Sequence, residues 1–83
     1  MNEWAIGDAF ESSNYPEHTT IITAITDEGI SWLSHHHSPF LIDTPSTKPV
    51  PIREFAQIIQ QDHWHYVGNI DPSTLPPKNR GAF

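Results

Sequence analysis

The strongest constraint in this chain is a run of β-branched residues that ends in a tight turn. His18–Thr26 consists almost entirely of threonine and isoleucine, whose side chains pack well on a pleated surface. Asp27-Glu28-Gly29 follows, and its glycine can take the positive φ that short hairpin turns need. Ile30–His35 is then predicted to be the returning strand, with Ile30 and Trp32 on one face. We therefore expect these two segments to form a β-hairpin.

Shorter segments predict the remaining strands. Trp4–Phe10 alternates apolar and other residues up to a Gly-Asp pair, which predicts a short strand that runs into a turn or bulge. Glu11–Glu17 contains the asparagine and proline that are typical of turns. Phe40–Ile42 predicts another short strand. His63–Val67 predicts the final strand, which we expect to end at Gly68.

One short helix is predicted over Ile52–Gln61. The apolar residues at positions 52, 55, 58 and 59 share one helical face. Pro51 suits the first helical position, because its φ is already helical and its missing N–H would have no partner there. The prolines of Thr44–Pro51, in contrast, keep that segment out of a sheet interior. We expect the helix to cover the sheet and to pack on its apolar side chains, namely Ile22, Ile25, Trp32 and Trp64.

Together these elements predict an α+β fold that is mainly β. The two candidates are a small SH3-like barrel and a twisted antiparallel sheet of about five strands, each with one short helix. Residues 1–68 are expected to form a single barrel-like domain, because 83 residues of which 36% are hydrophobic cannot supply two cores. Residues 69–83 are expected to be a proline-rich C-terminal tail. The chain has no cysteine, so burial of Trp4, Trp32, Phe55 and Trp64 has to replace disulfides as the source of stability.

Charge and hydropathy exclude two classes of partner. Ten acidic residues against four basic ones give a net charge of −6, which repels phosphate backbones, so no direct nucleic-acid binding is expected. No apolar run reaches the roughly 18–20 residues that span a bilayer, and the N-terminus lacks a signal-peptide pattern. We therefore expect a cytoplasmic protein with no membrane contact. The acidic residues form either a solubilising surface or a face that docks on a basic partner.

The histidines raise the question of a metal site. His63 and His65 are two residues apart on a predicted strand, so their side chains would share a face about 6.6 Å apart along the chain. Val67 lies on the same face, however, and the sequence has no His-Glu-x-x-His spacing. No metal or other cofactor is expected, and His63 with His65 is retained only as an alternative. The further ligand candidates for that alternative are His35, His37, Asp43 and Asp62.

A catalytic centre is not expected. Asp27 and Glu28 are adjacent carboxylates, but a hairpin tip is too well solvated for the pKa shifts that acid–base catalysis needs. Serines near the histidines lack the Gly-x-Ser-x-Gly turn that exposes a nucleophile. A chain of 83 residues also barely encloses a substrate pocket of about 300 Å³.

Ser34–Leu41 is the expected contact surface, because it begins with polar residues and ends in a Pro-Phe-Leu knob without a clear strand or helix to join. A tryptophan exposed beside Tyr66 or Phe40 is the alternative anchor of an interface. The acidic turn and the loop together give the partner-binding candidates Asp27, Glu28, His36, His37, Phe40 and Leu41.

Four pieces of the sequence carry a family resemblance. They are Trp4-x-Ile6-Gly7-Asp8-x-Phe10, the hairpin segment from residue 21 to residue 32, Pro51-Ile52-x-x-Phe55, and His63-Trp64-x-Tyr66-Val67. This pattern, over residues 4–67, resembles short phage- and prophage-encoded proteins. The resemblance implies an SH3-like small barrel and no catalytic activity. The insertion at residues 35–39 and the proline-rich tail depart from it.

Three functions remain open at this point. The first is a non-enzymatic, acidic protein-binding module, a phage-encoded inhibitor that occludes a host protein with a basic surface, such as an anti-phage defence protein, in the host cytoplasm. The second is a homo-oligomeric structural module of a phage particle that pairs through edge strands and the tail. The third is a small metal-binding protein that uses histidine ligands.

Overall fold

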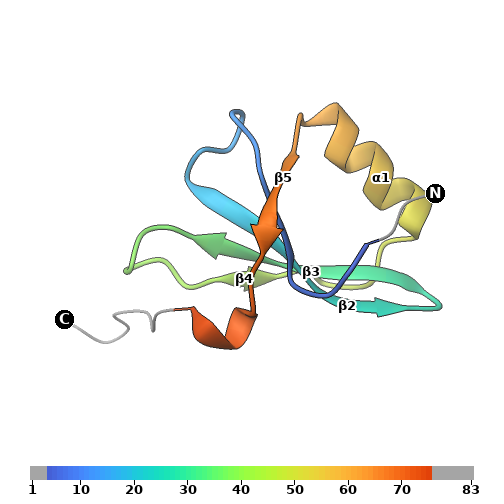
Figure 1. Ribbon diagram of the computed structural model, residues 1–83, viewed down its shortest axis with the longest axis horizontal. Helices are drawn as coiled ribbons and strands as arrows, with labels where there is room; N and C mark the ends of the chain where they lie inside the picture. Colours follow the sequence, from blue (N-terminus) through green and yellow to red (C-terminus); the bar gives the residue numbers. More distant parts are fainter. Residues whose placement is uncertain (1–3, 76–83) are drawn as a thin grey trace.

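The computed structural model describes residues 4–75 of the chain as one antiparallel sheet with one helix (Figure 1). The strands follow the order β4-β3-β2-β1-β5 across the sheet. The mainly-β prediction with about five strands and one helix is confirmed. Because β4 and β5 are the two edges, the sheet is open, which is the second of the two predicted architectures. The elements are β1 (Asp8–Glu11), β2 (His18–Thr26), β3 (Gly29–His36), β4 (Thr44–Pro45), α1 (Ile52–Gln61), β5 (His65–Asn69) and the 3-10 helix η1 (Pro72–Thr74).

The hairpin of β2 and β3 forms as the β-branched pattern predicts. Its register runs from His18 opposite His36 to Thr26 opposite Gly29, with one irregularity between Ile22 and Ala24. Gly29 takes a φ of +135°, and a Cβ atom there would collide with the carbonyl group of Val50. This turn therefore needs glycine both for its backbone conformation and for the close approach of the segment before α1.

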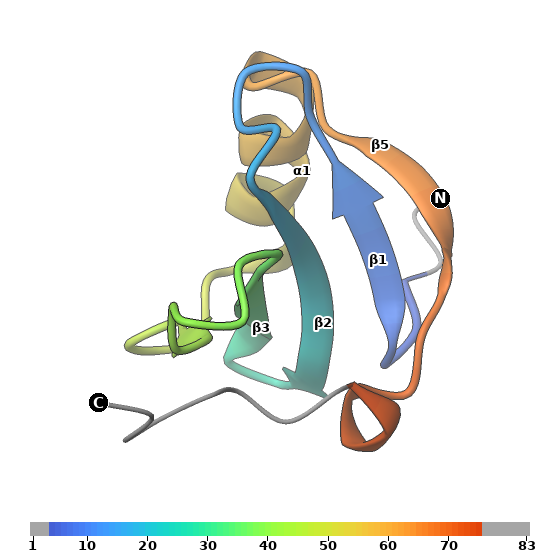
Figure 2. The ribbon, with the colours of Figure 1, turned by 90° about the vertical axis from the view of Figure 1, so that its left-hand side faces the viewer.

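The helix covers one face of the sheet and forms the core with it (Figure 2). Phe55 is the fully buried residue of α1, and its ring lies 5.2 Å from Trp4 and 5.5 Å from Trp32 between centroids. The fully or almost fully buried side chains of this core are Phe10, Ile22, Ile30 and Phe55. The predicted packing of Ile25, Trp32 and Trp64 against the core is confirmed, since these side chains are partly buried on it. At the start of the helical face, Ile52 remains 43% exposed.

Two predicted strand starts are too early, each because of a positive φ. β1 starts only at Asp8, because Gly7 has a φ of +96° and the chain turns there, with the N–H of Asp8 donating to the carbonyl of Ala5. β5 starts only at His65, because His63 has a φ of +56° and lies in the turn after α1. His63 and His65 therefore do not share a strand face, contrary to the prediction on which the alternative metal site depended.

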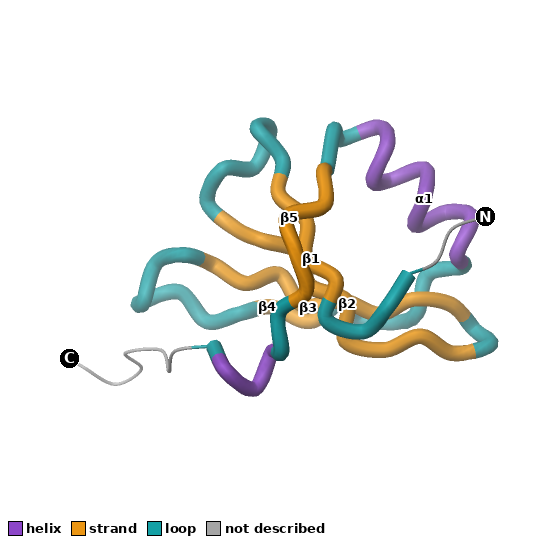
Figure 3. Tube along the Cα trace, in the orientation of Figure 1, coloured by secondary structure: helices purple, strands orange, loops and turns teal. Residues whose placement is uncertain are grey.

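The strand predicted at Phe40–Ile42 is wrong. These residues lie in a loop, and the short strand of this region is β4, which pairs with Leu33 and Ser34 of β3 (Figure 3). The proline in β4 lies at the edge of the sheet, where a missing backbone donor is tolerated.

Several smaller boundaries also differ from the predictions, and β3 is one residue longer at each end than predicted. Gly68 lies inside β5, opposite Ala9, with a φ of +141°. Pro51 is the residue before the helix rather than its first residue, and its carbonyl accepts the first helical hydrogen bond, from the N–H of Phe55. Within the predicted tail, Pro72–Thr74 forms η1, and residues 76–83 lie outside the described residues.

Candidate functional site

The predicted partner-binding residues fall into two groups at opposite ends of the β2–β3 hairpin (Figure 1). Asp27 and Glu28 form the turn between the two strands. The other four, which are His36, His37, Phe40 and Leu41, lie where β3 ends and in the loop that follows. A strand of nine residues separates the groups by about 26 Å, so they do not form one continuous surface.

The loop between β3 and β4 carries three consecutive exposed apolar side chains. Phe40 is 57% exposed, Leu41 52% and Ile42 54%, and we call these three residues the loop tip. A turn shapes it, in which the N–H of Phe40 donates to Ser38 Oγ and the N–H of Leu41 donates to the carbonyl of Ser38. Adjacent large apolar side chains on a surface are typical of an interaction site.

Hydrogen bonds at the base of this loop fix its direction. Asp43 accepts a bond of 3.1 Å from the N–H of His36, and its second oxygen lies 3.0 Å from Nδ1 of His35. Because an ionised carboxylate only accepts hydrogen bonds, Nδ1 of His35 carries the proton. On the other side of the loop, the N–H of His37 donates to the carbonyl of Glu17 at 2.9 Å. The loop tip therefore projects from an ordered base that also holds the neighbouring β1–β2 loop.

Glu11, Thr19 and His37 form a hydrogen-bonded row that resembles a catalytic relay. Thr19 Oγ1 donates to Glu11 Oε2 at 3.2 Å and lies 2.8 Å from Nε2 of His37. Since the hydroxyl proton points at the carboxylate, Nε2 of His37 donates to the hydroxyl oxygen. Thr19 is buried, so a substrate cannot reach this hydroxyl. The row serves to orient His37.

On the face of the hairpin opposite to Thr19, four rings form a cluster that we call the aromatic–histidine cluster. The rings of Tyr15 and Trp64 are nearly parallel, at 6°, with centroids 5.5 Å apart. His18 stacks on both, at 5.7 Å from Tyr15 and 5.8 Å from Trp64. His36 completes the cluster with its edge toward His18, at 5.4 Å. These rings come from the β1–β2 loop, the hairpin and the segment after α1.

The end of α1 holds the β1–β2 loop in the position that builds this cluster (Figure 2). Ser12 Oγ donates to the backbone carbonyl of Asp62, and the same hydroxyl oxygen accepts a bond from the N–H of Asn14. The turn at His63 then brings the chain back, and the N–H of Trp64 donates to the carbonyl of Ile59. The helix end thus fixes both partners of the ring stack.

The neutral form of His18 is favoured in the folded protein. Burial lowers the pKa of His18, and the neighbouring His36 and His37 lower it further. Glu17 acts in the opposite direction and raises that pKa. The ring therefore stacks on Tyr15 and Trp64 as a neutral imidazole at neutral pH.

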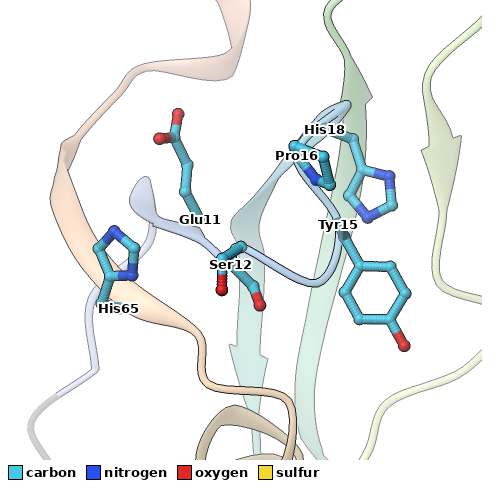
Figure 4. Close-up of a pocket in the computed structure, with 7 residues that line it drawn as sticks. Glu11, Ser12, Tyr15, Pro16, His18 and His65 are labelled. Atoms are coloured by element: carbon cyan, nitrogen blue, oxygen red, sulfur yellow. The ribbon is translucent and has the colours of Figure 1, made fainter.

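Two hollows border the aromatic–histidine cluster and share Tyr15 and His18. The outer hollow, of about 260 Å³, has His65 on one side and Tyr15 with Pro16 on the other (Figure 4). The inner hollow, of about 140 Å³, lies between α1 and the hairpin. Its described lining residues are Tyr15, His18, Thr20, Trp32, Ser34, Phe55, Ile58, Ile59, Asp62 and Trp64. Both volumes are below the roughly 300 Å³ at which small-molecule pockets begin.

Sequence reasoning missed this cluster as a site. The sequence predicts Trp64 in the core, and it does pack there, but its ring also stacks on Tyr15. No periodicity links a loop tyrosine to a tryptophan 49 positions further along the chain. The one available signal was Tyr15 itself, an aromatic residue between the asparagine and the proline of a turn.

Two classes of feature are missing from the part of the chain that is described. Among residues 4–75, no three or more histidine, aspartate or glutamate side chains are placed to hold a metal ion together. No helix in the same range is long and apolar enough to cross a membrane.

Comparison with known proteins gave no relative from which a function could be transferred. A scan against protein-family models, a search of curated proteins and a search of solved structures each found no match to this chain.

Proposed function

We propose that this chain is a non-enzymatic protein-binding module whose contact surface is the loop end of the hairpin. The observation that carries the proposal is the loop tip, in which three consecutive large apolar side chains are each more than half exposed. Their base is held by Asp43 and by the backbone bond from His37 to Glu17. Apolar anchors on an ordered base, surrounded by polar groups, are typical of the centre of a protein interface.

The partner that fits this surface is a protein with a basic face. The chain has a net charge of −6, so its field attracts positive surfaces and speeds their encounter. The resemblance to short phage-encoded proteins supports a host protein as the partner, and occlusion of a host defence protein as the result of binding. Complex formation should weaken as salt screens these charges.

Two features support binding rather than catalysis. The two hollows beside the aromatic–histidine cluster, lined by described residues and of about 140 and 260 Å³, are small for a substrate pocket. The adjacent carboxylates of Asp27 and Glu28 lie in an exposed turn, where water stabilises their charged forms.

The test uses a matched pair of exposed apolar residues. A partner is first captured from a bacterial lysate and purified, and its affinity is then measured by calorimetry. Leu41→Ser should weaken the complex at least about tenfold, as expected for an interface anchor. Ile6→Ser removes an equally exposed side chain, 58% against 52%, outside the loop end and should change affinity less than twofold. Equal effects of the two substitutions on affinity would show that the contact surface lies elsewhere.

A second candidate is self-association through the outer edge of β5. Tyr66 and Val67 are 58% and 44% exposed on this edge strand, and an open edge can pair with a second copy. The register shift between Ala9 and Phe10, where β5 has an extra residue, twists this edge and opposes such pairing. Sedimentation at micromolar concentration decides the question, because a monomer contradicts this second function.

A further inference from the structure

The inner hollow is lined by a stack of rings and by apolar side chains of α1. Tyr15, His18 and Trp64 present rings that are parallel to within 6–21°. Ile58 and Ile59 of α1 also line the hollow. Aromatic faces carry partial negative charge, so they attract cations as well as apolar groups.

The charges around the hollow favour a cation. Asp62 supplies the only carboxylate among the described residues that line it, and none of those residues is lysine or arginine. The carboxylate of Asp62 is not needed for the helix end, because the hydrogen bonds there use the backbone groups of this residue.

The volume of the hollow and the hydroxyl groups that line it favour one kind of cation. A volume of about 140 Å³ suits a single side chain rather than a small molecule. Thr20 and Ser34, which are register partners in the hairpin, add two hydroxyl groups that can accept hydrogen bonds. An arginine matches this set better than a lysine, because its planar guanidinium stacks on aromatic faces and pairs with a carboxylate through two N–H groups.

The geometry points to the inner hollow as a receptor for one arginine side chain of the partner protein. The guanidinium stacks beside Trp64 and Tyr15, and the carboxylate of Asp62 neutralises it. This inference rests on the proposed function and extends it. It adds a second anchor for the partner, a polar one at the aromatic–histidine cluster, to the apolar anchor at the loop tip. It also gives the acidic chain a specific way to recognise a basic face.

The experiment titrates the full chain with N-acetyl-L-arginine amide and follows the backbone and indole N–H signals by NMR. The signals of Trp64 and of Asp62 should shift first. The citrulline analogue has the same shape without the charge and should bind at least about tenfold more weakly. The lysine analogue should bind several-fold more weakly, because an ammonium group neither stacks nor pairs through a planar fork.

Two substitutions of equal charge change provide the control. Asp62→Asn should weaken arginine binding at least about fivefold, since it removes the carboxylate and keeps the shape. Asp27→Asn removes the same charge at the far end of the hairpin and should leave arginine binding unchanged. Equal binding of the arginine and citrulline amides, or equal effects of the two substitutions, overturns the receptor.

The same reagents separate this inference from the proposed function. If Leu41→Ser weakens the complex with the purified partner and Asp62→Asn does not, the receptor fails and the binding module stands. If the arginine amide binds in an Asp62-dependent manner but no partner complex forms, the binding module fails and the receptor stands.

Discussion

The two ends of the β2–β3 hairpin are built in different ways. At the turn end, two residues connect the strands, and the hydroxyl of Thr26 accepts a bond from the N–H of Glu28. At the loop end, residues 37–43 connect β3 to β4, and the supporting bonds come from the β1–β2 loop and from Asp43. Polar residues fill the turn, whereas the loop exposes apolar side chains.

This difference separates stability from recognition. A short turn with a required glycine has one backbone conformation and cannot adapt to a partner. Substitutions there should therefore act on folding. The loop tip exposes apolar side chains that the core does not need, so substitutions of these side chains should act on binding. The strongest tests of the comparison are changes that affect one end and spare the other.

Gly29→Ala should have the largest effect, a destabilisation of about 3 kcal/mol or more. The new Cβ would be strained at a φ of +135° and would collide with the carbonyl of Val50, so the costs of backbone strain and of overpacking add. Gly68→Ala is the matched control, because Gly68 has a φ of +141° and open space around it. It should cost only about 1–2 kcal/mol, from strain alone. Chemical denaturation measures both free energies, and equal losses would show that the contact with Val50 is unimportant.

The sequence predicts the elements whose information is local. β2 and α1 have the predicted ends, because a β-branched run and a 3.6-residue apolar period each lie within one segment. The turn at Gly29 was likewise predictable from three residues. The starts of β1 and β5 were not predictable, because the positive φ at Gly7 and His63 depends on how the neighbouring elements are placed in the fold.

The candidate site was predictable in part. The Pro-Phe-Leu knob gave the exposed loop tip, although Phe40–Ile42 was also expected to form a strand. The aromatic–histidine cluster was not predictable, because it depends on the bond from Ser12 to the carbonyl of Asp62, 50 residues away. The separation of the two groups of binding candidates is set by the nine-residue length of β2.

Ser12→Ala should have the next largest effect and should disturb the loop end. The Ser12 hydroxyl is buried, and its loss leaves the carbonyl of Asp62 with only the side-chain amide of Asn14, at a cost of about 1–2 kcal/mol. Tyr15 should then leave its stack on Trp64, and the near-ultraviolet circular dichroism should decrease. Ser13→Ala, at an exposed neighbour, should change stability by less than about 0.5 kcal/mol. An unchanged near-ultraviolet spectrum of Ser12→Ala would contradict the role of this bond.

The pH dependence of stability should reveal the titration of His18. Its pKa is lower in the folded chain than in the unfolded one, mainly because of burial, so the unfolded state binds the proton more readily. Stability contributed by neutral His18 is therefore complete above about pH 6.5 and is lost as the pH falls toward the folded pKa. Thermal midpoints from pH 7.5 to pH 5.0 measure this loss. His18→Gln should flatten the profile, and an unchanged profile would contradict this assignment.

The smallest effect is expected from the double substitution Asp27→Asn and Glu28→Gln. These carboxylates lie about 26 Å from the loop end, beyond the screening length of about 8 Å at 0.15 M salt. Affinity for the partner should therefore fall less than about threefold at that salt concentration. At 0.01 M salt the screening length is about 30 Å, so the association rate should fall further while the dissociation rate stays unchanged. Stopped-flow kinetics at both salt concentrations measure the two rates. A faster dissociation at 0.15 M would place the turn end inside the contact and remove the distinction between the two ends.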